Sequence, residues 1–195
     1  MLAECPQFVS GGDDDVSEYA NAGTMRHKAL YALLAGDDDK PLLALPEVDR
    51  SGVQWAAEQI RLLAPMSDYP LECEVRDSFV GPNFIEINGT PDVVCGPYVF
   101  DLKWRPRNYD AQMAAYAGMR VNKGWRMVNV YLLFGATQRK SHLKFGQDEI
   151  DEALGNVIHP VLDNDPPRPC EYCDWCVKRL ICFACFVQVN AIAFG

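Results

Sequence analysis

Two aspartates and a lysine are the residues whose types and spacing most suggest shared chemistry. Asp92 follows the segment Gly89–Pro91, and Asp101 and Lys103 are two residues apart in an apolar, strand-like stretch. Residues two apart in a strand share one face, so the side chains of Asp101 and Lys103 point the same way. If the strand that begins at Asp92 pairs with this one across the Gly96-Pro97 turn, the two carboxylates converge.

A converging pair of carboxylates is suited to Mg²⁺ or Mn²⁺, which take oxygen ligands and retain water. A lysine beside such an ion orients or deprotonates the attacking water and helps to neutralise charge that develops on a phosphate. An exposed ion pair on a sheet edge gives the same D-x-K letters, so these three residues alone are a weak signal. Glu72 and Glu74 lie on an upstream strand, and they fit a solvated strand face as well as a metal site.

Cysteines form the second group with chemical potential. The chain has eight cysteines, and residues 170–182 contain four of them, Cys170, Cys173, Cys176 and Cys182. The N-terminal sequence has neither the basic nor the apolar region of a secretory signal, which predicts a cytoplasmic protein. In a reducing compartment, clustered cysteines indicate metal or redox chemistry more often than disulfides. The scattered Cys73, Cys95 and Cys185 are predicted to be buried apolar residues.

The hydrophobic pattern predicts the elements that must position these residues. Helices are predicted at Ser17–Ala35, Val53–Leu63, Tyr109–Val121 and Glu149–Ile158. Short strands resembling an antiparallel meander are predicted at Leu71–Val75, Phe84–Ile87, Asp92–Val94 and Tyr98–Trp104, with further strands at Val128–Phe134 and Ser141–Phe145. This order predicts an α/β or α+β fold in which helices flank a mixed central sheet, within one domain spanning residues 1–195.

Charge is distributed unevenly along the chain. The net charge of −9 is unfavourable for a protein that binds nucleic acid. Residues 103–147 nevertheless contain a single acidic residue, Asp110, and nine basic residues: Lys103, Arg105, Arg107, Arg120, Lys123, Arg126, Arg139, Lys140 and Lys144. Such a stretch attracts a phosphate backbone locally, although a solvated basic face has the same composition. No apolar run is long enough to span a bilayer, so no membrane association is predicted.

Four landmarks, in order, resemble the RecB-like exonuclease branch of the PD-(D/E)XK nuclease superfamily. They are a helical G-x-x-x-H at Gly23–His27, G-x-x-D at Gly89–Asp92, D-x-K at Asp101–Lys103 and Q-x-x-x-Y at Gln112–Tyr116. The resemblance implies a restriction-endonuclease-like core in which His27, Asp92 and Asp101 bind Mn²⁺ or Mg²⁺. It also implies that Lys103 assists the nucleophile, while Gln112 and Tyr116 contact DNA and support the lysine. Taken singly, each landmark also fits an ordinary structural role.

The cysteines extend the resemblance to iron–sulphur nucleases of this branch, such as the AddB helicase–nuclease subunit and the CRISPR-associated Cas-four proteins. Cys173-x-x-Cys176 followed by Cys182 matches their C-terminal signature, and Cys5-Pro6 stands where their upstream ligand lies. The resemblance implies a 4Fe–4S cluster held by Cys5, Cys173, Cys176 and Cys182, which would join segments 1–10 and 168–185. Two alternatives stay open: Cys170 as the fourth ligand, and zinc in place of the cluster.

The resulting hypothesis is a metal-dependent deoxyribonuclease, with exonuclease action on single-stranded DNA as the first expectation. The shortness of the chain favours a minimal nuclease that acts in phage DNA processing or in CRISPR adaptation, where a CRISPR integrase or a recombination protein would be its partner. The alternatives are a non-catalytic, metal-stapled nucleic-acid-binding or adaptor protein and a small electron carrier. The sequence sets neither the polarity of digestion nor the oligomeric state.

Overall fold

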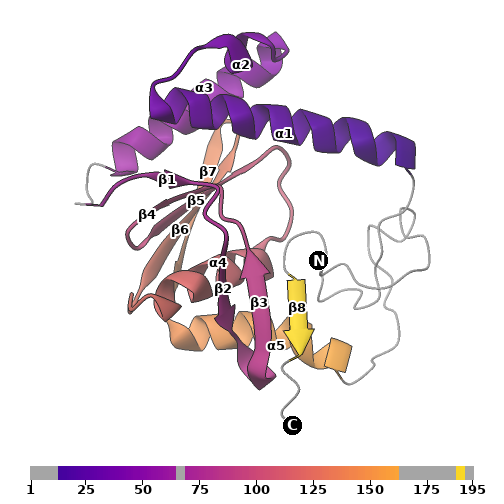
Figure 1. The fold of residues 1–195 in the computed structure, drawn as a ribbon, viewed down its shortest axis with the longest axis vertical. Coiled ribbons are helices and arrows are strands. Elements are labelled where there is room, and N and C mark those ends of the chain that lie inside the picture. The colour runs from indigo at the N-terminus through magenta and orange to yellow at the C-terminus, as the bar shows by residue number, and fades with distance from the viewer. Residues whose placement is uncertain (1–12, 65–68, 163–187, 192–195) are drawn as a thin grey trace.

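The computed structural model describes residues 13–64, 69–162 and 188–191 of the chain. Helices lie on both faces of a central mixed sheet, with α1, α2 and α3 on one side and α4 and α5 on the other (Figure 1). The predicted α+β class with a mixed, helix-flanked central sheet is therefore confirmed.

Three helices form the first layer: α1 (Asp13–Ala35), α2 (Lys40–Leu43) and α3 (Glu47–Leu63). The first ends where Gly36 takes a φ of +76°, a left-handed conformation that glycine adopts readily. The third begins at Glu47 rather than at the predicted Val53. Acidic residues at Glu47 and Asp49 favour its first turn because they face the positive end of the helix dipole.

The central sheet has five strands in the order β1-β4-β5-β6-β7. These are β1 (Glu72–Cys73), β4 (Val93–Cys95), β5 (Tyr98–Lys103), β6 (Val128–Phe134) and β7 (Arg139–Phe145). Strands β5 and β6 are parallel, and every other pairing in this sheet is antiparallel. The parallel pair requires a crossover, which contains α4 (Asp110–Asn122), and α5 (Gln147–Leu162) follows the last of these strands.

The predicted continuous meander is wrong in one respect, because its second strand leaves the central sheet. Strand β3 (Ile85–Gly89) pairs with β2 (Asp77–Val80) and with β8 (Gln188–Ala191) in a separate three-stranded sheet. The short helix η2 (Pro82–Phe84) connects the hairpin. Ile85 and Ile87 are buried in the core on the α4 side, so this hairpin packs beneath the central sheet instead of extending it.

Strand β5 is buried on both faces because its side chains alternate between two hydrophobic cores. Val99 packs with residues of α4 and α5, whereas Phe100 and Leu102 pack with residues of α1 and α3. The same alternation directs Asp101 and Lys103 toward the α4 side. The fold thus places two charged residues in a strand that has almost no contact with water.

Close packing at Gly52 seats α3 against the end of β6. A Cβ atom at this position would lie 2.5 Å from the carbonyl oxygen of Gly135 and 2.6 Å from Cη2 of Trp104. The backbone oxygen cannot move away as a flexible side chain can, so only glycine fits here.

Among the described helices, none combines the length and the apolar character that a membrane span needs.

Substitution Gly52→Ala is expected to destabilise the protein by about 1–3 kcal/mol, because the added methyl group overpacks the junction of α3 and β6. Helix propensity alone predicts the opposite sign, a gain of about 1 kcal/mol. Urea unfolding followed by circular dichroism measures the difference. The control is Gln54→Ala at an exposed position of the same helix, and an unchanged or raised midpoint for Gly52→Ala would contradict the close packing.

Candidate active site

Asp92 and Asp101 lie on neighbouring segments of the chain at one end of the central sheet. Val93 pairs with Phe100 across β4 and β5, and continuing this register by one residue sets Asp92 opposite Asp101. Asp92 is 8% exposed and Asp101 is 1% exposed. The strand pairing that the sequence predicted across the Gly96-Pro97 turn therefore forms, and both carboxylates are buried.

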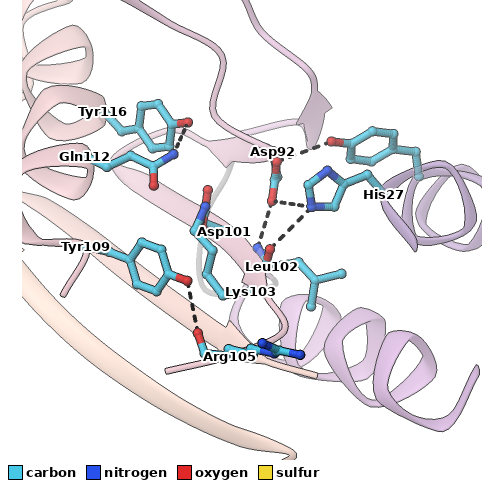
Figure 2. Close-up of polar contacts among 10 residues, drawn as sticks. His27, Asp92, Asp101, Leu102, Lys103, Arg105, Tyr109, Gln112 and Tyr116 are labelled. Carbon is cyan, nitrogen blue, oxygen red and sulfur yellow. Dashed lines mark hydrogen bonds and ion pairs between the residues drawn. The ribbon is translucent and has the colours of Figure 1, made fainter. Parts of the chain in front are cut away.

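The carboxylate of Asp92 is held from several sides (Figure 2). The backbone N–H of Leu102 donates a hydrogen bond to Asp92 Oδ2 at 2.8 Å. His27 Nε2, from α1, lies 3.4 Å from the same oxygen and 3.3 Å from the carbonyl oxygen of Leu102. A carboxylate, an imidazole nitrogen and a backbone carbonyl thus converge at one point from three segments of the chain.

Asp101 and Lys103 form an ion pair beside this point. Lys103 Nζ lies 2.7 Å from Asp101 Oδ2, and within the described part of the chain Asp101 Oδ1 has no hydrogen-bond partner. Burial raises the pKa of Asp101 to about 6. The positive charge of Lys103 offsets only part of this rise, and the negative charge of Asp92 adds to the rise. Burial also works to lower the pKa of Lys103, but the nearby Asp101 and Asp92 outweigh it and raise the value above normal.

Gln112 and Tyr116 lie on the far side of Asp101 from His27 (Figure 2). Gln112 Nε2 donates a hydrogen bond to Tyr116 Oη at 2.8 Å, as expected for residues one helical turn apart on α4. Both side chains are buried. Burial and the charges of Asp101 and Asp92 raise the pKa of Tyr116, so its hydroxyl keeps its proton. The four landmarks predicted from the sequence are thus near one another in space.

The glycines of two landmarks have different surroundings. A Cβ atom at Gly89 would lie 2.8 Å from Cε of Met119 and 3.0 Å from Cε1 of Tyr116, so the absence of a side chain lets Tyr116 pack there. A Cβ atom at Gly23 would meet no described atom within 4 Å. Packing therefore explains the glycine of G-x-x-D, whereas nothing in the described residues explains the glycine of G-x-x-x-H.

Sequence reasoning missed two tyrosines that contact the site. Tyr31 Oη donates to Asp92 Oδ1 at 3.5 Å, and burial and the charge of Asp92 raise the Tyr31 pKa. Its position four residues after His27 on one helix was the available signal. Tyr109 places its ring 4.9 Å from Lys103 Nζ and donates a hydrogen bond from Oη to the carbonyl oxygen of Arg105. No sequence spacing pointed to this tyrosine.

The remaining candidate residues are exposed, buried elsewhere or outside the described residues. Glu72 and Glu74 are exposed, and the N–H of Glu74 donates to the backbone oxygen of Asp92. Cys95 is buried as predicted, whereas the prediction for Cys73 is wrong, because its two-residue edge strand leaves it exposed. The proposed cluster ligands lie outside the described residues: Cys5, Cys170, Cys173, Cys176 and Cys182, with Cys185 also outside.

The donor set at this end of the sheet fits a hard divalent cation. It offers two carboxylates, one backbone carbonyl and one imidazole, and one buried oxygen of Asp101 lacks a hydrogen bond to the described residues. Over the ranges that the structure describes, no three His, Cys, Asp or Glu side chains are already gathered as a metal-binding group. His27 instead contacts Asp92 and Leu102, and Asp101 contacts Lys103.

Substitution Asp101→Asn is expected to change how stability depends on pH in the presence of a chelator. Folding raises the pKa of this carboxyl from 3.8 to about 6, so its contribution to stability is full below about pH 4 and is lost as the pH rises through 6. The variant should therefore gain stability relative to the wild type between about pH 4 and pH 6, with little further change above.

Urea unfolding across this pH range measures the effect, and Asp110→Asn, at an exposed position of α4, is the matched control. The slope with pH is the readout, because the variant also removes a partner of Lys103 and so changes absolute stability. A difference between variant and wild type that stays constant from pH 4 to pH 7 would show that Asp101 is not held in an unfavourable charged state.

Comparisons with known proteins leave the family of this chain open. No family model matches the sequence, and no curated protein matches it. One solved structure, described as "Crystal structure of SSO0001", has 15% sequence identity to the chain and a TM-score of 0.38. The match covers 80% of this chain and 77% of that one. Function is therefore inferred from the residues of this chain alone.

Proposed function

We propose that this protein is a metal-dependent DNA nuclease of the RecB-like PD-(D/E)XK kind. One observation carries the proposal. His27 Nε2 lies 3.4 Å from Asp92 Oδ2 and 3.3 Å from the carbonyl oxygen of Leu102, and the buried Asp101–Lys103 ion pair lies beside this point. An ordinary structural ion pair does not need a second buried carboxylate and a histidine at the same place. Two buried carboxylates facing one lysine are costly to folding, which favours a catalytic explanation.

The donor atoms favour Mn²⁺ or Mg²⁺ over softer metals. Oxygen donors suit both ions, and the imidazole of His27 shifts the preference toward Mn²⁺. A bound cation would supply an activated water and would offset negative charge on the phosphate. The N–H of Leu102 and the hydroxyl of Tyr31 each bind one oxygen of Asp92, so they fix the orientation of that carboxylate. Such supporting contacts commonly tune metal affinity.

Lys103 is positioned to act as a cation rather than as a base in the metal-free protein. Its raised pKa keeps the ammonium group protonated at neutral pH. A protonated lysine orients a water molecule and donates hydrogen bonds to a phosphate oxygen that gains charge. Tyr109 packs its ring against the ammonium group, which limits the directions in which the side chain can point.

The arrangement of elements is compatible with a restriction-endonuclease-like core. His27 comes from the helix that covers one face of β5, and Gln112 and Tyr116 come from the helix that follows β5. Asp101 and Lys103 lie on β5, and Asp92 immediately precedes β4, the antiparallel partner of β5. Single-stranded DNA, exonuclease action, and a place in CRISPR adaptation or phage DNA processing remain parts of the proposal that rest on the sequence resemblance.

The direct test is cleavage of labelled linear and circular single-stranded DNA in the presence of Mn²⁺. The wild type should degrade the linear substrate, and Asp101→Ala and Lys103→Ala should each lower the rate on the order of 10²-fold or more, because each removes a group that faces the reacting phosphate. Protection of the circular substrate would indicate an exonuclease. Linear and circular substrates degraded alike would indicate an endonuclease instead.

The matched controls are Asp110→Ala and Lys144→Ala, which remove an exposed carboxylate and an exposed ammonium group. Both should keep wild-type activity, and circular dichroism should show that all four variants fold. A wild type that binds DNA but cleaves nothing with Mn²⁺ or Mg²⁺ would refute the nuclease and favour the non-catalytic binding or adaptor protein. Retained cleavage by Asp101→Ala would refute this site.

The proposed 4Fe–4S cluster rests on sequence, since its cysteines lie outside the described residues. Protein purified without oxygen should be brown, with a broad visible absorption that Cys5→Ala and Cys173→Ala abolish and Cys170→Ala preserves. The reverse outcome for Cys5 and Cys170 would make the four ligands local. A colourless protein that contains zinc would replace the cluster with a zinc site. Nuclease-inactive Asp101→Ala should keep the colour.

A further inference from the structure

The nine basic residues between positions 103 and 147 do not form one surface. The guanidinium of Arg120 is buried and its Nε donates to the carbonyl oxygen of Gly96 at 3.0 Å. Lys123 forms an ion pair with Asp77 of β2. These two charges hold α4 against neighbouring segments, so they are structural. The basic residues available to a polyanion are fewer than the sequence suggests.

The direction of the strands separates the remaining basic residues into two ends of the sheet. The parallel register pairs Tyr98 with Asn129 at one end and Lys103 with Phe134 at the other. Arg126 precedes β6 and Lys144 pairs with Asn129, so both lie at the Tyr98 end. At about 3.3 Å per residue along β5, this end is roughly 17 Å from Lys103.

Arg139 lies at the same end of the sheet as Lys103. It pairs with Phe134, which in turn pairs with Lys103, so two strand spacings, about 10 Å, separate Arg139 from the lysine. Directly paired residues share a face, so Arg139 and Lys103 are on the same side of the sheet. The next residue, Lys140, is on the opposite side, where its Nζ reaches Gln59 of α3.

The connection between β5 and α4 brings two more arginines to this end. Arg105 and Arg107 lie two and four residues after Lys103 and are exposed. The backbone between them and α4 is fixed, because Tyr109 Oη donates to the oxygen of Arg105 at 3.0 Å and the N–H of Asp110 donates to Asn108 Oδ1 at 2.8 Å. An ordered backbone that carries exposed guanidinium groups binds an anion with little loss of chain entropy.

We propose that Arg105, Arg107 and Arg139 form a phosphate-binding strip that holds the backbone of a single nucleic-acid strand on both sides of the phosphate at Lys103. This inference rests on the proposed nuclease function, and it names the residues that bind the substrate. The strand runs from the β5–α4 loop past Lys103 toward β7. Guanidinium groups suit phosphates because their planar N–H groups bind two oxygens at once.

The acidic character of the whole chain does not oppose such a strip. At physiological ionic strength the screening length is about 8 Å, so charges elsewhere on the chain are largely screened from a phosphate held at these arginines. Asp110 is the single acidic residue among residues 103–147. It lies in the first turn of α4, where the positive end of the helix dipole offsets its charge.

The test measures binding of a labelled single-stranded oligonucleotide in chelator, where no cleavage occurs, at several salt concentrations. Each phosphate contact contributes about 0.7 to the slope of log affinity against log salt for a single strand. Arg105→Ala/Arg107→Ala should therefore lower the slope by about 1.4 and weaken binding at least about tenfold. Arg139→Ala should lower the slope by about 0.7. Arg105→Lys/Arg107→Lys keeps the charge and should retain most of the slope.

The matched control is Arg126→Ala/Lys144→Ala, which removes the same net charge from the opposite end of the sheet. It should leave the slope close to that of the wild type. Equal losses from both double variants would show a general effect of net charge and would overturn the strip. Absence of any salt-dependent binding by the wild type would overturn it as well.

Cleavage kinetics separate this inference from the proposed function. With Mn²⁺, the Arg105→Ala/Arg107→Ala variant should raise KM and leave kcat nearly unchanged, because the strip holds substrate away from the reacting atoms. A wild type that cleaves DNA while this variant binds and cleaves normally would refute the strip alone. A wild type that binds through the strip but does not cleave would refute the nuclease and leave the strip standing.

Discussion

The buried ion pair of Asp101 and Lys103 is the constraint on which the site depends. Removing two charges from water costs several kcal/mol for each ion, and mutual attraction offsets this cost only at short range. Their separation of 2.7 Å meets that condition. The pair is nevertheless incompletely satisfied, since within the described residues one oxygen of Asp101 has no hydrogen bond. Folding therefore retains an unfavourable charge that a bound cation would stabilise.

The central position of β5 is what keeps this pair buried. A strand that pairs on both edges and is covered on both faces exposes none of its backbone, and its side chains have to alternate between two cores. Phe100 and Leu102 fill one core, and Val99 fills the other. Only Asp101 and Lys103 depart from this apolar pattern. The cost of two charges in such a strand is the physical reason to regard them as functional rather than as surface residues.

Much of the site was predictable because it depends on short-range rules. The two-residue period of a strand placed Asp101 and Lys103 on one face, and the turn at Gly96-Pro97 set the pairing with Asp92. The four-residue period of a helix placed Gln112 beside Tyr116. The pairing of β3 with β8 was not predictable, because it joins segments about 100 residues apart and no local pattern specifies a partner at that distance.

Contacts made by single side chains across elements were equally beyond the reach of the sequence. Tyr109 precedes α4 and reaches back to Lys103, a contact that depends on how the connecting loop folds. The basic stretch of residues 103–147 shows the same limit. A count of charges along the chain does not distinguish Arg120, which is buried against Gly96, from Arg126, which is exposed.

A second ion pair shows how the fold fixes the position of His27. Arg26 Nε lies 2.8 Å from Asp49 of α3, and its guanidinium stacks 4.1 Å from the ring of Trp104, the residue after Lys103. One side chain thus ties α1 to both α3 and the end of β5. Because His27 is the next residue on the helix, its distance to Asp92 depends on this tie. Asp49 is satisfied by its partner Arg26. Asp101 instead keeps an oxygen without a hydrogen bond in the described structure and lies opposite a second buried carboxylate, that of Asp92. This combination separates a structural ion pair from one suited to chemistry.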